Sequence, residues 1–192
     1  MTAPDDRLAG IIRQERWLWE ILVWLAARNP PDWHVGAGCL TQCVWNRLSG
    51  RPSRVGVNDI DVVFFDPGDL REDPETTLEA DLADAFGDLK MAFDVKNQAR
   101  VHLWYAQRFG YAIPPYPSVH AAIDTWPTTA TAIAVTLRDG EPAIYAPFGL
   151  GDLFAMTARP NKRQITPEIY EKKVMRWRRH WPELTVVPWD AA

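Results

Sequence analysis

Apolar residues recur at three- and four-residue spacing in several stretches of the chain, as they do along the buried face of an amphipathic helix. This pattern predicts one long helix over about residues 7–28. Asn29-Pro30-Pro31 would end it, because proline cannot continue a helix. The same pattern predicts further helices over about 39–49 and 99–107, and others that begin near Asp73, Ser118 and Thr166.

Short runs rich in β-branched and aromatic residues predict the strands. These runs lie at about 33–35, 59–65 and 91–97. Residues 131–145 predict a β-hairpin, because two apolar runs flank the turn-forming pair Asp139-Gly140. The chain therefore mixes strands with helices along most of its length.

A single domain over residues 1–192 accounts for this order of elements, since the chain has no internal repeats and no convincing linker. Apolar residues make up 47% of it, which is enough for a substantial core. We expect fold class α/β (α+β), a small mixed β-sheet flanked by helices. The core of this fold is expected at about 30–110, and a C-terminal hairpin and helices at about 111–192.

Acidic side chains are concentrated between residues 66 and 88, which hold nine of them against one arginine. Leu78, Leu82 and Phe86 mark an inward stripe through this segment. The acids are therefore expected on the solvent face of the helix that begins near Asp73. The basic residues of the last helix are likewise expected mostly on its solvated side, namely Lys172, Lys173, Arg176, Arg178 and Arg179.

The net charge is −4, from 21 Lys and Arg against 25 Asp and Glu, so the overall field gives no reason to expect general nucleic-acid binding. Cys39 and Cys43 lack the nearby histidines of a zinc site and are expected as small buried hydrophobes in a reducing cytosol. No apolar run approaches 18 residues, and the N-terminus has no signal-peptide pattern. We expect a cytoplasmic protein with no membrane association.

Two aspartates open the apolar run Asp59-Ile60-Asp61-Val62-Val63-Phe64-Phe65-Asp66. Side chains alternate along a strand, so Asp59 and Asp61 project from the same face. At about 5 Å and an effective dielectric near 20, the two anions repel by roughly 3 kcal/mol. Mg²⁺ prefers carboxylate oxygens together with substrate phosphates, so this pair at the start of a buried strand predicts a divalent-cation site.

Two further features can join this pair. Gly36-Ala37-Gly38 lies between a predicted strand and a predicted helix, where backbone amides attract phosphate, although a tight turn with no ligand explains it as well. Asp94 lies in the next predicted strand, either as a third metal ligand or as a hydrogen-bonded edge residue. A metal-dependent phosphodiesterase would normally add histidine ligands, and none is near Asp59 or Asp61 in the sequence.

The glycine turn, the Asp-x-Asp pair and the third carboxylate together resemble the nucleotidyltransferases of the DNA polymerase β superfamily. The closer resemblance is to a bacterial nucleotidyltransferase-like family of unsettled role, and it covers nearly the whole chain. It is carried by residues 36–46, 59–66, 95–102, 115–116, 128–132, 146–154 and 159–162.

This resemblance implies a polymerase β-like fold and a metal-dependent nucleotidyltransferase, which transfers NMP from an NTP to a hydroxyl acceptor and releases pyrophosphate. Asp59, Asp61 and Asp94 would be catalytic and would hold two Mg²⁺ ions, with Mn²⁺ as a substitute. The expected partners are an NTP and an unidentified acceptor, and the oligomeric state is left open. A catalytically inactive nucleotide-binding module and a partner-interaction module are alternatives on the same fold.

At the glycine turn, the resemblance implies nucleotide contacts from Gly36, Ala37 and Gly38 to the phosphates. The chain departs from many relatives here, because Ala37 separates the glycines and Cys39 follows them, so the turn offers no hydroxyl. The gap of 21 positions from Gly38 to Asp59 is also longer than in the minimal enzymes.

Three other groups of residues are candidate nucleotide ligands. Asn97 is a candidate for a base or sugar contact. Arg100 is a candidate for bidentate phosphate binding, although a pair with the acidic helix explains it as well. The basic loop of Arg159, Lys162 and Arg163 is a candidate triphosphate clamp.

Overall fold

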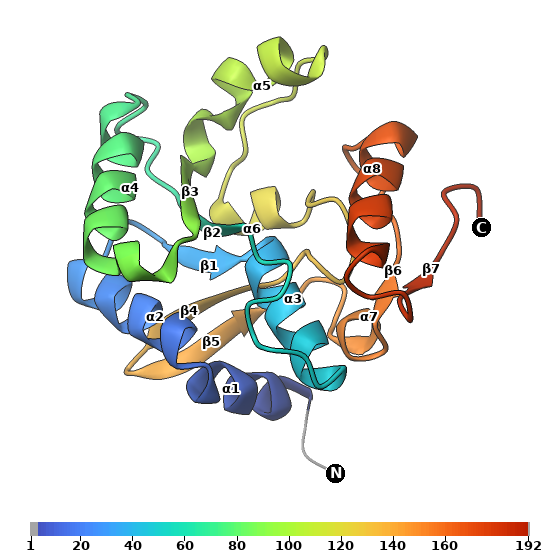
Figure 1. Ribbon diagram of the computed structural model, residues 1–192. Helices are drawn as coiled ribbons and strands as arrows, with labels where there is room; N and C mark the ends of the chain where they lie inside the picture. The colour runs from blue at the N-terminus through green and yellow to red at the C-terminus, as the bar shows by residue number, and fades with distance from the viewer. Residues whose placement is uncertain (1–3, 192) are drawn as a thin grey trace.

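The computed structural model describes residues 4–191, and its central element is a five-stranded mixed β-sheet (Figure 1). The strand order is β3-β2-β1-β4-β5, with β2 and β3 parallel and the other neighbours antiparallel. The strands are β1 (His34–Gly36), β2 (Asp59–Phe64), β3 (Ala92–Asn97), β4 (Ala134–Arg138) and β5 (Glu141–Tyr145). The predicted mixed sheet is confirmed, and so is the hairpin, whose turn residues Asp139 and Gly140 both have positive φ.

Helices pack around this sheet. Those of the described residues are α1 (Pro4–Gln14), α2 (Arg16–Arg28), α3 (Ala37–Leu48), α4 (Asp73–Phe86), α5 (Val101–Phe109), α6 (Val119–Ile123), α7 (Gly151–Phe154) and α8 (Pro167–Arg178). Two 3₁₀ segments, η1 (Gly87–Leu89) and η2 (Gln98–Arg100), border β3. Figure 1 shows α4 along the β3 edge, α1 and α2 beside the β4–β5 hairpin, and α5 and α8 in the upper part of the view.

The prediction of a single helix over 7–28 is wrong, because Glu15 leaves the helical conformation at φ −86° and ψ 90°. The break separates α1 from α2 and lets both helices bury apolar residues in the same core. Those residues are Leu8, Ile11, Ile12, Leu18, Ile21, Leu22 and Leu25. The apolar spacing continues across the break without proline or glycine at the bend, so the sequence pattern did not reveal it.

Helix α8 is fixed to the rest of the fold by aromatic packing and by a small second sheet. The rings of Trp177 and Trp181 each meet Trp45 of α3 edge-on, with centroids 5.5 Å apart. The indole N–H of Trp181 donates to Asn46 at 3.1 Å. Tyr170 donates from its hydroxyl to carbonyls beside the two-stranded sheet β6 (Thr157–Ala158) and β7 (Thr185–Val186), which the sequence pattern did not predict. These contacts determine which side of α8 faces β2.

One acidic residue contradicts the expectation that the acids of α4 all face solvent. Glu75 is only 3% exposed. It accepts hydrogen bonds from the backbone N–H of Asn97 and from Arg100, each at 2.7 Å. Burial is the main influence on this carboxyl and raises its pKa. Glu75 therefore joins α4 to the end of β3 from inside the fold.

The two cysteines occupy the buried positions that the sequence predicts. Cys39 and Cys43 are buried free thiols, as predicted. Burial raises the pKa of both thiols, so they behave as small apolar side chains. Among the described residues, no helix combines the length and the apolar character that crossing a bilayer requires.

Candidate active site

The register of three neighbouring strands brings the candidate carboxylates onto one face of the sheet. Asp61 in β2 pairs with Gly36 in β1 on one side and with Asp94 in β3 on the other. Paired residues on strands about 4.8 Å apart point to the same face. Asp59 lies two positions before Asp61 and therefore shares that face as well. The structure thus places the three predicted acidic residues on one face of the sheet, while their role as metal ligands stays a prediction.

A cavity of about 150 Å³ opens where this face meets the glycine turn and α8. Ala37, Gly38, Asp59 and Asp61 form one part of its wall. Another part comes from α8 and consists of Lys173, Arg176 and Trp177. Carboxylates and cations therefore line the same small polar space, an arrangement suited to a metal ion with a phosphate.

Asp61 has the most strongly perturbed carboxyl group of this site. Burial raises its pKa to about 7, and the negative charges of Asp59 and Asp94 act in the same direction. Lys173 and a backbone hydrogen bond from Gly38 oppose that rise only partly. Burial therefore disfavours the ionised form of Asp61 more than the charges of its neighbours do, and a divalent cation bound here would favour that form.

The prediction of a mostly solvated helix face is wrong for Lys173, which is partly buried, whereas Arg176 is exposed as predicted; both line the cavity. Lys173 is partly buried, and burial lowers the pKa of its ammonium while Asp61 raises it. The spacing of 173, 176 and 177 marks one side of a helix. The sequence did not show, however, that this side would face the Asp59 and Asp61 carboxylates.

The glycine turn is shaped largely by its packing against β4. A methyl group on Gly36 would lie 2.3 Å from the carbonyl oxygen of Ile133, so only glycine fits there. Ala37 adopts a left-handed φ of 56°, and its N–H donates to the same Ile133 oxygen at 3.0 Å. Gly38 lines the cavity and contacts Asp61 through its backbone. The phosphate contacts of Gly36, Ala37 and Gly38 therefore stay a prediction, since Ala37 and Gly38 already use their backbone within the fold.

Asn97 holds a structural position instead of the predicted nucleotide contact. Its side chain is fully buried. Its oxygen accepts from the N–H groups of Asp66 and Ala99, and its nitrogen donates to the carbonyls of Asp66 and Asp69. These four bonds use its hydrogen-bonding capacity and leave none for a base or sugar.

Arg100 is likewise committed to the protein. It forms an ion pair with Glu75 at 2.7 Å, and its Nε donates to the Leu70 carbonyl at 3.2 Å. Its side chain is only 12% exposed. The pairing with the acidic helix, which the sequence left open, is the arrangement that the structure shows. Arg100 reaches a cavity of about 780 Å³ beside Asp94 but not the cavity at Asp61.

Asp94 and Asp59 line different cavities. It lines the 780 Å³ cavity and forms an ion pair with Lys96 at 2.7 Å. Among residues 4–191, no three Asp, Glu, His or Cys side chains converge closely enough to form a ready metal site. Asp59 and Asp61 are therefore the main candidate metal ligands, whereas Asp94 is paired with Lys96.

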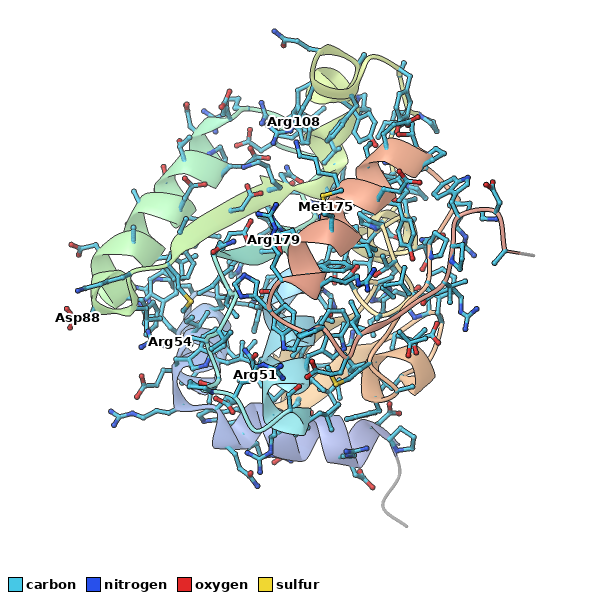
Figure 2. All side chains as sticks on the ribbon, turned by 45° about the vertical axis from the view of Figure 1, so that its right-hand side comes forward. Arg51, Arg54, Asp88, Arg108, Met175 and Arg179 are labelled. Carbon is cyan, nitrogen blue, oxygen red and sulfur yellow. The ribbon has the colours of Figure 1, made fainter. Side chains whose placement is uncertain are left out.

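A cavity of about 380 Å³ with several aromatic lining residues lies between α5 and α8 and borders these regions. It shares Asp61 and Lys173 with the small cavity, and Lys96 with the cavity at Asp94. Arg108 of α5, labelled in Figure 2, lines both of the larger cavities. Asp61 thus stands where the polar pocket meets space large enough for a planar ligand.

Comparison with known proteins agrees with this geometry. Residues 25–186 match the sequence model of a family described as nucleotidyltransferase. The chain belongs to this nucleotidyltransferase family. No curated protein matches it.

A solved structure supports the fold of this nucleotidyltransferase. That structure is described as "The NMR structure of the protein reveals a CCA-adding enzyme head domain". The two chains share 24% sequence identity and superpose with a TM-score of 0.76, over 95% of each chain. The predicted family resemblance and the predicted nucleotidyltransferase fold are therefore confirmed.

Proposed function

We propose that this nucleotidyltransferase is a metal-dependent enzyme that transfers NMP from an NTP to a hydroxyl acceptor. The observation that carries the proposal is the alignment of Gly36, Asp61 and Asp94 across three strands, with Asp59 on the same face. The raised pKa of Asp61 supports it, because a bound cation would offset the cost of burying this carboxylate beside Asp59 and Asp94. Membership of the family supports nucleotidyl transfer as the reaction class.

The carboxylates fit the donor set of Mg²⁺ or Mn²⁺, which prefer oxygen ligands. Asp59 and Asp61 would hold the first ion. Asp94 would help to hold a second ion, once its ion pair with Lys96 is replaced by a bond to the metal. When bound, such ions lower the barrier of an in-line displacement by neutralising charge on the attacking and leaving oxygens.

The protein's own groups then position the reacting atoms. The start of α3, beside Gly38 in the wall of the cavity, would face the phosphates, as helix N-termini do in other phosphate sites. Asp94 borders the large cavity and would orient the acceptor hydroxyl. The hydroxyl would release its proton to the Asp94 carboxylate as its oxygen forms a bond to the α-phosphorus. The bond from this phosphorus to the bridging oxygen would then break, and pyrophosphate would leave.

A nucleotide-binding module without turnover is the second candidate function. The ion pair between Asp94 and Lys96 favours it, because this contact occupies the carboxylate that would complete the catalytic metal site. Lys96→Ala distinguishes the two. If the protein is an enzyme, Lys96→Ala should keep or gain metal affinity, because Asp94 is released, and should form product. If the protein is an inactive module, this variant should still form no product.

The test is incubation of the protein with each α-labelled NTP, Mg²⁺ and a cell extract, following pyrophosphate and labelled product. Wild-type protein is expected to form both, and Asp61→Asn to form neither. Asp66→Asn is the matched control, since Asp66 follows β2 and its carboxylate accepts from the Gly68 N–H at 2.9 Å outside the cavity. Equal product from wild type and Asp61→Asn would contradict the proposal.

A further inference from the structure

The cavity of about 780 Å³ beside Asp94, called the Asp94 cavity below, shares no lining residue with the small cavity at Asp61 among residues 4–191. We propose that the Asp94 cavity binds the acceptor, and that the acceptor is a small hydroxyl compound with a planar ring and an anionic group. This inference rests on the proposed function and names the class of its second substrate.

The strand order places the Asp94 cavity on the side from which an acceptor would enter. In the register of the sheet, Asp61 lies between Gly36 of β1 and Asp94 of β3. The attacking and leaving oxygens of an in-line displacement lie on opposite sides of the phosphorus. Since pyrophosphate would leave toward the glycine turn, the hydroxyl would approach from Asp94. Its proton would pass to the Asp94 carboxylate as its oxygen bonds to the α-phosphorus.

The size of the Asp94 cavity suits a small molecule. Its volume of about 780 Å³ falls within the roughly 300–1,000 Å³ that is typical of small-ligand sites. One lining residue, Glu72, has a side chain that is 70% exposed. A nucleic-acid strand would be repelled by this carboxylate and by the net charge of −4 in proportion to its many phosphates. A compound with a single anionic group fits better.

One cation of the Asp94 cavity is free to bind that group. Arg108 lines the cavity, is exposed, and forms no ion pair within 4.0 Å among residues 4–191 (Figure 2). The other charged lining residues are all paired with one another, namely Glu72 and Glu75 with Arg100, and Asp94 with Lys96. A guanidinium binds phosphate or carboxylate through two parallel hydrogen bonds, so Arg108 is suited to an anion of either kind.

The basic loop differs from Arg108 in this respect. Arg159 pairs with Asp152 at 2.8 Å, and Arg163 pairs with Asp124 at 3.2 Å. The two arginines of the clamp that the sequence suggested are therefore engaged within the protein. The free guanidinium beside Asp94 comes from α5.

The surface for a planar ring comes from the same helix. Trp104 and Phe109 line the Asp94 cavity, where Trp104 is half-buried and Phe109 is 38% exposed. Trp104 lies four residues before Arg108, so both side chains lie on one face of α5. Their positions are about 6 Å apart along the helix axis, so one small molecule can stack on the indole and meet the guanidinium.

The experiment measures binding of AMP, adenosine and ribose 5-phosphate by calorimetry, in Mg²⁺ with a saturating non-hydrolysable NTP. AMP carries a ring, hydroxyls and an anionic group, whereas adenosine lacks the anion and ribose 5-phosphate lacks the ring. Wild-type protein is expected to bind AMP about tenfold more tightly than either. The pair of 4-hydroxyphenylacetate and uncharged 4-hydroxyphenylethanol tests a carboxylate in the same way, and the pair with the larger affinity ratio identifies the anion.

Two substitutions separate the ring from the anion. Arg108→Ala should weaken AMP about tenfold and leave adenosine unchanged, because only AMP has a charge to lose contact with. Trp104→Ala should weaken AMP and adenosine about fivefold or more and leave ribose 5-phosphate unchanged, because stacking needs the ring. A residue that only supported the fold would weaken all three compounds alike.

The chain offers a matched control for each substitution. Leu103→Ala should bind all three compounds as wild type does, because Leu103 is on the same helix, is 57% exposed and lines neither the Asp94 cavity nor the 380 Å³ cavity. Arg178→Ala is the charge-matched control, because Arg178 is exposed and lines a separate outer surface of α8. Binding of the NTP itself, titrated separately, should be unchanged in Arg108→Ala.

A wild type that prefers neither anionic probe over its uncharged counterpart would overturn the inference. An equal loss of AMP and of the NTP in Arg108→Ala would also overturn it, because the arginine would then belong to the nucleotide site. The two proposals fail separately. Protein that transfers NMP but shows no such preference loses this inference alone. Protein that selects AMP through Arg108 and Trp104 but transfers no NMP keeps the ligand class of the Asp94 cavity and loses the proposed function.

Discussion

Replacing Asp61 with asparagine removes a carboxyl group that is poorly tolerated as an anion in the metal-free fold. Its pKa is raised from 3.8 to about 7, first by burial and then by Asp59 and Asp94. Between about pH 4 and pH 7 the folded protein keeps a proton that the unfolded chain has already released. The free energy of unfolding of the metal-free protein therefore falls across this range as pH rises, and levels off above pH 7.

The magnitude follows from the same two values. A difference of about 3 pH units, at 1.36 kcal/mol for each, gives an upper value of about 4 kcal/mol for the cost of ionising Asp61. The residue retains partial exposure, so solvent screening reduces this to about 2–3 kcal/mol. Asparagine has nearly the same shape without the charge. We expect Asp61→Asn to raise the free energy of unfolding by about 2–3 kcal/mol at pH 8.

The assay is urea unfolding in EDTA at pH 4 and at pH 8, followed by the fluorescence of the tryptophans, of which the chain has ten. The stabilisation should appear at pH 8 and nearly vanish at pH 4. Added Mg²⁺ at pH 8 should stabilise wild type and leave Asp61→Asn unchanged, and Asp66→Asn should behave as wild type. An Asp61→Asn protein no more stable than wild type at pH 8 would refute this reasoning.

Three further outcomes follow from the structure. Arg100→Ala should lower the free energy of unfolding by about 3 kcal/mol, because it leaves the buried Glu75 charge unpaired, and should leave Mn²⁺ binding unchanged in a titration. Gly36→Ala should destabilise the fold by about 1–3 kcal/mol or more in thermal unfolding, since its methyl would meet the Ile133 carbonyl at 2.3 Å. Apparent Mn²⁺ affinity should rise with pH up to about 7 and then level off, because protons compete for Asp61; a flat profile from pH 5 to 8 would count against the assignment.

The acidic part of the site could be predicted from the sequence because it depends on local periodicity. Asp59 and Asp61 share a face by the two-residue repeat of a strand, whatever surrounds them. Asp94 required only that the next predicted strand be the neighbour of β2, and the parallel β2–β3 pairing makes it so. The same local reasoning placed the hairpin turn at Asp139-Gly140.

The remaining site residues depend on contacts between distant segments, which periodicity does not encode. Lys173 reaches Asp61 because Trp177 and Trp181 pack on Trp45, far away in the chain. Asn97 was a candidate ligand because it is a polar residue at the end of a strand near the site. Its side-chain amide instead forms hydrogen bonds with the backbone of Asp66, in the loop after β2. In both cases the deciding partner lies on another element.

The most direct test of the central claim is a crystal structure with Mn²⁺ and a non-hydrolysable NTP, in which anomalous scattering locates the metal. The account predicts Mn²⁺ bonded to carboxylate oxygens of Asp59 and Asp61 and to phosphate oxygens of the nucleotide, with Asp94 turned away from Lys96 toward the metal. A nucleotide bound elsewhere, or bound here with no metal at these carboxylates, would contradict it.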